Sequence, residues 1–213
     1  MTVVSIRMGT EEDLRRVELA DGSPFSFRLS HLSQELLSEL DFIDPAESRE
    51  LSEAEEEGLL FARDCFLAEK AALQLIARAE QTVFGLGMKL KKRGHGSACT
   101  KTVVSGLCEG GLLDDFRYAK LWLELRIAGR SSSPRRLIAS LCSKGIDRDD
   151  AETALGEVLD DEAEVRLLDR FIHRNQGVCS ELLLEDADER RSLKHILKGE
   201  GFSASAICKF LGE

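Results

Sequence analysis

The sequence predicts a mainly α-helical chain, in which three tandem three-helix repeats form an elongated, curved body behind a small N-terminal β-hairpin element. Three observations support this fold class. Apolar residues alternate with polar ones before residue 30, whereas from about residue 60 they recur every three or four residues, the period of an amphipathic helix. A leucine pair that closes on a glycine occurs three times. Only 3 of the 213 residues are proline, which permits long helices.

The N-terminal region, residues 1–58, is predicted to hold the β-element and an acidic linker. Apolar residues of the segment 15–29 alternate with polar neighbours on both sides of the turn sequence 21–24, a pattern typical of a hairpin of two or three strands. These apolar residues are Val17, Leu19, Phe25, Phe27 and Leu29. The stretch 45–58 contains six acidic residues, which indicates a linker or an exposed helix start.

Helix starts beyond residue 60 are marked by capping residues. A carboxylate accepts hydrogen bonds from the N–H groups of a first helical turn. The aspartates expected in this role are Asp114, Asp115, Asp147, Asp149 and Asp160. Pro134 follows three serines and is expected in the first turn of another helix. The apolar stripe of the first long helix is predicted to comprise Leu67, Ala71, Leu75, Ile76, Ala79 and Val83.

An internal repeat organises the helices. Its three copies are Leu86-x3-Leu90-x3-Gly94, Leu137-x3-Leu141-x3-Gly145 and Leu193-x3-Leu197-x3-Gly201. Glycine after the last helical turn supplies the left-handed conformation that ends a helix. A longer helix precedes each copy and a short one follows, which gives repeats at 59–109, 110–159 and 160–213, the last with an insertion at about 175–187. Because each repeat buries little apolar surface alone, neighbours are expected to stack.

Charge is distributed unevenly along this chain of net charge −10. Residues 1–60 carry 5 basic and 15 acidic groups, whereas residues 61–109 carry 8 basic and 4 acidic groups. A locally positive segment can approach phosphates although the whole chain is acidic. No apolar run reaches the about 20 residues of a membrane helix and the N-terminus lacks a secretory pattern, so a cytoplasmic protein is expected. The six cysteines, none in a C-x-x-C pair, are interpreted as reduced core residues.

Motifs for catalysis, metal binding or cofactor binding are missing from the sequence. Segment 94–102 ends in Lys-Thr like a phosphate-binding loop, but His95 and Thr100 stand where that loop needs glycines, so a glycine turn followed by a helix is expected. The four histidines form no i, i+4 pair, and no zinc-type Cys/His spacing occurs. We therefore expect a protein that is not an enzyme and that has no metal and no cofactor.

Basic residues recur around the second helix of each repeat. In the first repeat they are Lys89, Lys91, Lys92 and Arg93. In the second repeat they are Arg126, Arg130, Arg135 and Arg136, and in the third Arg190, Arg191, Lys194 and Lys198. Stacked repeats would align these clusters into an interrupted basic stripe suited to an acidic partner. The alternative is a solvated helix face that keeps the protein soluble.

The second repeat has a characteristic order of motifs. It runs from GLLDDFRYA at 111–119 through Arg126 to PRRL at 134–137, KGI at 144–146 and Ala151-x2-Ala154-Leu155. This order resembles the central repeat of the RecX regulatory family, and the glycine motifs of the other repeats resemble the family's flanking repeats. The resemblance covers roughly 60–213. One departure is Gly199-Glu200, where the family frequently has a basic pair.

The resemblance implies a non-enzymatic regulator that binds the filament of the recombinase RecA on single-stranded DNA. Such a protein lies in the filament groove and suppresses its ATPase, strand-exchange and co-protease activities. The residues expected to contact the filament or DNA are Lys89, Lys91, Lys92, Arg93, Arg130, Arg135 and Arg136, whereas Asp115, Arg126 and the three repeat glycines are expected to be structural. We expect a monomer without membrane contact. The alternative is a helical module that binds DNA directly, without RecA, and loses affinity steeply with salt.

Overall fold

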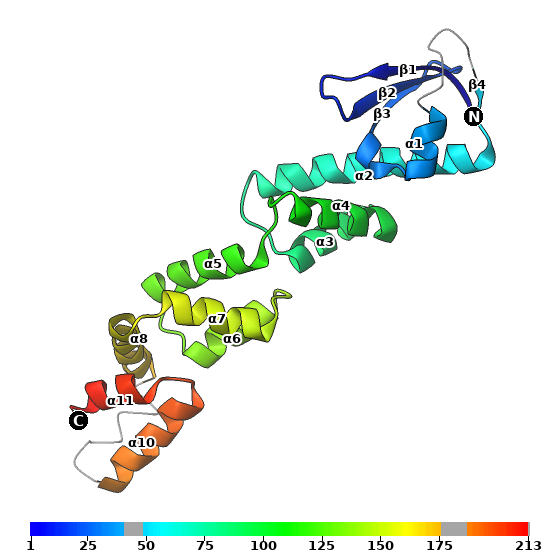
Figure 1. Cartoon of the computed structure of the whole chain (residues 1–213). Helices are drawn as coiled ribbons and strands as arrows, with labels where there is room; N and C mark the ends of the chain where they lie inside the picture. The colour runs from blue at the N-terminus through cyan, green and yellow to red at the C-terminus, as the bar shows by residue number, and fades with distance from the viewer. Residues whose placement is uncertain (41–48, 176–186, 213) are drawn as a thin grey trace. The chain divides into compact units, whose positions relative to one another are not determined.

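The computed structural model describes residues 1–40, 49–175 and 187–212, and it confirms a mainly helical fold behind an N-terminal sheet (Figure 1). The chain forms two compact units, Met1–Leu113 and Asp114–Glu213. The first unit contains β1 (Thr2–Met8), β2 (Leu14–Leu19), β3 (Pro24–Arg28), a 3-10 turn (Leu29–His31), α1 (Gln34–Leu40), β4 (Arg49–Glu50), α2 (Glu53–Ile76), α3 (Val83–Lys92) and α4 (Ser97–Glu109). The second contains α5 (Asp115–Gly129), α6 (Pro134–Cys142), α7 (Arg148–Val158), α8 (Asp161–Arg174), α10 (Ala187–Gly199) and α11 (Ala204–Leu211).

The N-terminal sheet is antiparallel, with strand order β3-β2-β1-β4. β2 and β3 form the predicted hairpin, with Val17 opposite Phe25 and Gly22 at a φ of 78° in the turn. The sheet is larger than predicted. The short strand β4 comes from the acidic stretch predicted as a linker or helix start, and it pairs with the first residues of β1. Leu51, which is buried, anchors this stretch, and its N–H donates to the Met1 carbonyl at 3.0 Å.

Helix α2 joins the sheet to the first repeat. Ser52 and Glu55 form a capping box at its start. Its N-terminal half packs against the sheet through Leu59 and Ala62, and its C-terminal half contributes the small residues Cys65, Ala68 and Ala72 to the core with α3 and α4. The predicted stripe is therefore partly wrong: Leu67 is 50% exposed and Ala79 is exposed. Small side chains give a weak hydrophobic signal but let helices approach closely.

The three glycine motifs fold into the same turn, as the repeat predicted. Gly94, Gly145 and Gly201 have φ angles of 90°, 89° and 90°. The N–H that follows each glycine donates to the carbonyl of the leucine before it, at 3.2 Å to Leu90, 3.3 Å to Leu141 and 3.2 Å to Leu197. This pattern is the Schellman motif, in which a left-handed residue satisfies the last carbonyls of a helix. The recurring sequence thus encodes a recurring helix end.

The predicted helix starts are confirmed, although Asp115 and Asp149 lie within the first turns of their helices and are not the caps. Asp114, Asp147 and Asp160 are the N-caps of α5, α7 and α8, and each side chain accepts a backbone N–H of the first turn. Ser133 caps α6, with Pro134 in its first turn. The segment that ends in Lys-Thr forms the start of α4 after a glycine turn, as expected. Caps and glycines therefore set most helix boundaries in the described chain.

The second unit buries one apolar core to which both of its repeats contribute. Leu123, Leu137 and Leu141 of α5 and α6 belong to the same cluster as Leu168 of α8 and Ile207 of α11. The first unit instead has two clusters, one under the sheet and one inside the first repeat. Stacking of the second repeat on the third is thus observed. We propose 1–58, 59–109, 110–159 and 160–213 as the sequence units, although α2 crosses the first of these limits.

The cysteine prediction is confirmed in part. Five cysteines lie in the described residues as free thiols: Cys65 and Cys99 are buried, and Cys142 and Cys208 are half-buried. Cys108 is exposed, because Val104 and Leu107 take the core positions of that turn of α4. The sixth, at position 179, and most of the insertion lie outside the described residues. No helix in the described parts of the chain is long and apolar enough to cross a bilayer.

Candidate partner-binding surface

The basic residues predicted in the first repeat gather at the C-terminal end of α3. Leu86 and Leu90 are fully buried and fix which face of α3 meets the core. Lys89, Lys91 and Lys92 occupy the last turn, and Arg93 follows as the C-cap. All four are exposed. Cations are favourable at this end, where the helix dipole is negative.

Lys89 differs from its three neighbours because it makes an internal contact. Its Nζ donates to Oε1 of Gln81, a buried residue between α2 and α3. The Gln81 amide in turn donates to the carbonyl of Ala79 at 2.8 Å. Lys89 therefore ties α3 to the end of α2. In the described chain, the side chains of Lys91, Lys92 and Arg93 have no hydrogen-bond or ion-pair partner.

The basic residues of the second repeat flank the loop between α5 and α6. Arg130 and Arg136 are exposed. Arg135 instead faces the third repeat: its N–H donates to the Glu200 carbonyl at 3.0 Å, and its guanidinium donates to the Gly199 carbonyl at 3.3 Å. Only part of the predicted set in this repeat is therefore free of internal contacts.

The turn at the end of α10 holds the start of α6. The Ser133 hydroxyl donates to the Glu200 carboxylate and accepts the Arg136 N–H at 3.4 Å. Gly201 lies so close that a Cβ built on it would stand 3.2 Å from the Arg135 nitrogen. A carboxylate near a helix N-terminus is electrostatically favourable. The pair Gly199-Glu200, which replaces the basic pair frequent in the RecX family, thus has a packing role. Its contacts with the start of α6 form a joint between the second and third repeats.

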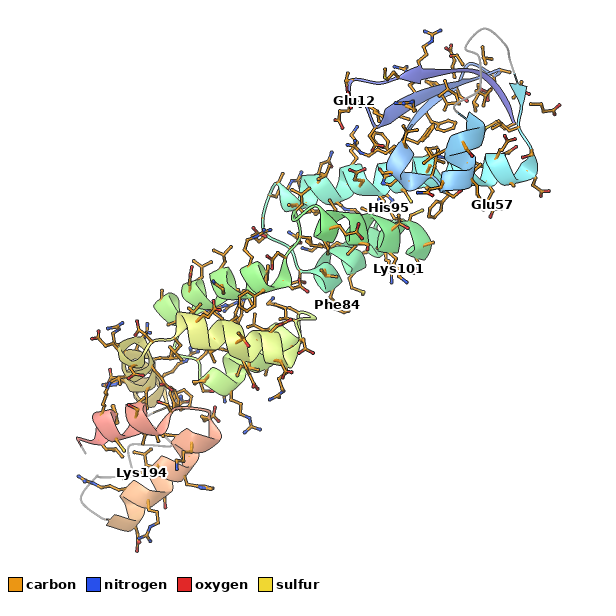
Figure 2. All side chains as sticks on the ribbon, in the orientation of Figure 1. Glu12, Glu57, Phe84, His95, Lys101 and Lys194 are labelled. Carbon is orange, nitrogen blue, oxygen red and sulfur yellow. The ribbon has the colours of Figure 1, made fainter. Side chains whose placement is uncertain are left out.

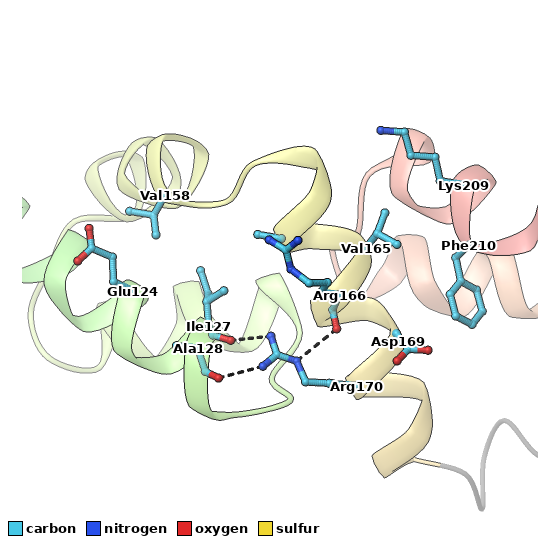
Figure 3. A pocket seen from close by; sticks show the side chains of 11 residues that line it. Glu124, Ile127, Ala128, Val158, Val165, Arg166, Asp169, Arg170, Lys209 and Phe210 are labelled. Atoms are coloured by element: carbon cyan, nitrogen blue, oxygen red, sulfur yellow. Dashed lines mark hydrogen bonds between the residues drawn. The ribbon is translucent and has the colours of Figure 1, made fainter.

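Sequence reasoning missed Arg170, which makes a second joint between the same repeats. Its guanidinium donates to the Ile127 carbonyl at 2.6 Å and to the Ala128 carbonyl at 3.0 Å, which closes the C-terminal end of α5 (Figure 3). Beside it is a cavity of about 910 Å³, whose apolar part includes Val165 and Phe210. The partners of Arg170 lie 43 and 42 residues earlier, so no local pattern marks it.

The aromatic residues of α5 are half-buried. The Arg126 guanidinium lies 4.9 Å from the ring centroid of Trp122, and the Lys144 Nζ lies 5.9 Å from it. Such cation–π contacts stabilise by about 0.5–1 kcal/mol at exposed sites. The expected structural role of Arg126 agrees with this contact.

Two further features of the described residues concern metal-binding groups and a buried thiol. They contain no group of three or more His, Cys, Asp or Glu side chains that could hold a metal ion. Burial, together with the neighbouring Cys99, raises the pKa of the Cys65 thiol, so this cysteine stays protonated and is a poor nucleophile. What the surface offers is exposed positive charge on α3 and beside α6.

Comparison with known proteins identifies the family. Residues 114–155 match the model of the second three-helix domain of RecX. The regulatory protein RecX of Halorhodospira halophila is 39% identical over 144 residues, which cover 64% of this chain and 81% of that protein. The chain belongs to the RecX family. The family resemblance of the second repeat is thereby confirmed.

Other RecX proteins agree with this assignment. The regulatory protein RecX of Treponema pallidum is 36% identical over 121 residues, covering 55% of this chain and 74% of that protein. A crystal structure of regulatory protein RecX matches 100% of this chain and 99% of its own with a TM-score of 0.66 at 18% identity. RecX from Lactobacillus salivarius matches 70% of this chain and 95% of its own with a TM-score of 0.54 at 22% identity. These two structures establish the fold, and the sequence relatives establish a family of regulatory proteins.

Proposed function

We propose that this RecX-family protein binds the filament that RecA forms on single-stranded DNA and inhibits its ATPase, strand-exchange and co-protease activities. It acts in the cytoplasm as a monomer that lies in the filament groove. Membership of a regulatory family supports the proposal. The structural observation that carries it is the basic end of α3, where Lys91, Lys92 and Arg93 are exposed without internal partners in a chain of net charge −10.

The basic end of α3 suits recognition of an acidic surface. Charges on the rim of an interface mainly set orientation and association rate rather than the final affinity. A filament presents the same surface at regular intervals, so several weak contacts from successive repeats add through a high effective concentration. Arg130, at the end of α5, and Arg136, in the first turn of α6, are exposed and supply the corresponding contact in the second unit.

The test is the single-stranded-DNA-dependent ATPase of the cognate RecA, with this protein titrated from well below to equimolar amounts. We expect inhibition at substoichiometric ratios, because each bound molecule spans more than one protomer. A DNA-independent ATPase in the same buffer is the control for non-specific effects. If RecA hydrolyses ATP at an unchanged rate up to equimolar protein, the proposal is wrong.

Direct DNA binding without RecA is the second candidate, and the exposed cations beside α3 and α6 favour it. Each phosphate contact releases counterions, so affinity for a single strand falls with salt at a log–log slope of about −0.7 per contact. A salt titration with a labelled oligonucleotide therefore separates the two candidates. Tight, steeply salt-dependent binding to bare DNA with no effect on RecA would support the DNA-binding module.

A further inference from the structure

A groove between α3 and α4 lies next to the basic end of α3. It has a volume of about 300 Å³ and is lined from α3 by Phe84, Gly87, Met88 and Lys91 and from α4 by Thr100 and Lys101. Figure 2 labels Phe84 and Lys101, on the two helices that form it. Neither the family assignment nor the proposed contact with RecA assigns a role to this groove.

The walls of the groove expose large apolar side chains. Phe84 is 54% exposed and Met88 is 53% exposed, whereas Leu86 and Leu90 on the opposite side of the same helix are fully buried. Phe84 and Met88 are four residues apart, so they are neighbours on the surface of α3. Exposure of two adjacent large apolar groups beside a hollow is typical of an interaction site, because water contact with them is unfavourable until a partner covers them.

Gly87 keeps the groove open. A glycine inside a helix destabilises it relative to alanine. A Cβ at this position would meet only Cγ2 of Thr100, at 3.9 Å, which is an ordinary contact. The packing of α3 on α4 therefore does not require glycine here. What glycine provides is space between Phe84 and Met88, above the floor formed by α4.

The groove holds one buried hydroxyl without a partner among the described residues and two exposed lysines. The Thr100 side chain is 3% exposed, and its hydroxyl has no hydrogen-bond partner in the described chain. Lys91 and Lys101 line the groove, and no carboxylate belongs to its lining. Neither lysine forms an ion pair within the described residues. An occupant that carries negative charge on either side of an apolar group would complement this arrangement.

We propose that the α3–α4 groove binds an acidic segment of a partner polypeptide, which inserts one large apolar side chain between Phe84 and Met88 and places carboxylates near Lys91 and Lys101. A polypeptide fits better than a single-stranded nucleic acid, which binds along a track of cations with successive aromatic platforms. The groove has one aromatic residue, aliphatic walls and two lysines. The groove shares Lys91 with the proposed filament contact, but the inference concerns the chemistry of the occupant and not the identity of the partner, so it can fail while the filament contact holds.

The decisive variant is Gly87→Leu, which fills the groove without weakening α3. Its matched control is Gly156→Leu in α7, where a Cβ meets nothing within 4 Å. Both changes replace an exposed or half-buried helical glycine by the same good helix former, so both variants should be at least as stable as the parent. Thermal unfolding followed by circular dichroism verifies this, and loss of binding in Gly87→Leu alone then reports occupation of the groove.

The probe is a fluorescein-labelled peptide in which aspartates and glutamates flank a central Leu-Phe pair, and binding to the full chain is followed by fluorescence polarisation. We expect saturable binding that weakens at least tenfold in Gly87→Leu and stays unchanged in Gly156→Leu. A peptide with serines in place of Leu-Phe should bind at least tenfold more weakly. Absence of saturable binding, or equal binding by the two glycine variants, overturns the proposal.

Charge reversal provides an independent arm. Lys101→Glu should lower the affinity for the acidic peptide severalfold. Lys70 is an exposed lysine of α2 that does not line the groove, so Lys70→Glu should leave this affinity unchanged. A labelled oligothymidine is titrated in parallel. The assignment to a polypeptide is wrong if the oligonucleotide competes with the peptide and its binding is lost in Gly87→Leu. It is also wrong if only the oligonucleotide, and not the peptide, binds the groove. In either case the occupant is nucleic acid.

Discussion

Helices α3 and α6 hold the same place in successive repeats, yet their basic residues have different surroundings. Both follow a long first helix and end in the same Schellman turn, at Gly94 and at Gly145. On α3 the cations sit in the last turn and project into solvent. On α6 they sit in the first turn, where Arg135 contacts the carbonyl of Gly199 in the next repeat. A repeated charge pattern therefore does not imply a repeated function.

The helix dipole explains this difference. Cations stabilise the C-terminal end of a helix, so Lys91 and Lys92 need no further partner on α3. At the N-terminal end of α6 the dipole disfavours positive charge, and a carboxylate from elsewhere is stabilising there. Glu200 supplies it through its contact with Ser133. We infer that α3 serves partner binding, whereas the start of α6 mainly joins repeats.

Charge reversal on α3 should have the largest effect on regulation. The triple variant Lys91→Glu, Lys92→Glu, Arg93→Glu should raise the concentration needed for half-inhibition of the RecA ATPase at least tenfold, because it replaces attraction by repulsion on an exposed surface. The double variant Arg130→Glu, Arg136→Glu should raise it only a few fold.

Circular dichroism of both charge variants verifies that helix content is unchanged, since all five side chains are exposed. Equal inhibition by the α3 variant and the parent protein would mean that the assignment of α3 is wrong. A larger effect from the α6 variant would reverse the comparison between the two helices.

Two glycines that end equivalent helices should respond unequally to alanine. Gly94→Ala adds only the strain of a left-handed residue, about 1–2 kcal/mol, because nothing lies within 4 Å of the added Cβ. Gly201→Ala carries the same strain and also presses on the nitrogen of Arg135 at 3.2 Å and on Cβ of Pro134 at 3.4 Å. We expect about 1 kcal/mol more destabilisation at Gly201, as for mild overpacking.

Urea unfolding followed by circular dichroism measures both glycine variants. The one tryptophan of the chain, Trp122, lies in the second unit, so its fluorescence should report the Gly201→Ala transition but not the Gly94→Ala transition. Equal losses of unfolding free energy would show that the joint at Gly201 contributes no packing of its own.

The helix ends were predictable from sequence, but the helix faces were less so. A helix ends at a glycine four residues after a leucine, and a helix starts at an aspartate before an apolar run. Both signals act on the backbone within one helical turn, so all the residues of the interaction are close together in the sequence. The core face of α2 depends on a sheet and two helices that pack from different sides. Its small residues Ala62, Cys65 and Ala68 are buried while Leu67 is half exposed, which a periodicity of large side chains does not indicate.

The candidate site was predictable in composition but not in its contacts. The sequence located the seven cations, and the structure places all seven on the surface, at helix ends or beside a loop. Lys89 and Arg135 take internal partners, and the partner of Arg135 lies 64 residues away. The groove beside Phe84 left no signal because exposure of an apolar residue becomes visible only once its helix is packed.

Loss of the Glu200 carboxylate should have a smaller effect than Gly201→Ala. Glu200→Ala removes the acceptor of the Ser133 hydroxyl and the negative charge near the start of α6, with an expected cost of about 1–2 kcal/mol. Glu200→Gln keeps an acceptor and should lose about half of that. Tryptophan fluorescence during urea unfolding measures both, and Glu152→Gln, an exposed carboxylate of α7, is the control. Unchanged stability in Glu200→Ala would remove the electrostatic account of α6.

The smallest effect concerns acid and separates the two units. His31 packs at the sheet–α2 boundary, and burial lowers its pKa. The positive charge of Arg28 lowers the pKa further, whereas the negative charges of Glu69 and Asp13 raise it without cancelling the shift. The folded state binds the His31 proton less readily than the unfolded chain does. The contribution of neutral His31 to the free energy of unfolding is therefore fully present above the unfolded pKa of about 6.5. It falls as the pH drops below this value and stops falling once the pH is below the folded pKa. His173 and His195 in the second unit are exposed.

Hydrogen exchange of α2 at pH 7.5 and at pH 5.5, each corrected for the intrinsic exchange rate, tests this prediction. Between pH 7.5 and pH 5.5, α2 should lose more protection in the parent protein than in the His31→Asn variant. Both proteins contain the same carboxylates, so the difference between their two losses reports His31 alone. Trp122 fluorescence should give the same difference between the two pH values in both proteins, because His31 lies in the other unit. An identical pH response of α2 in the two proteins would mean that burial of His31 contributes nothing to the acid sensitivity of the first unit.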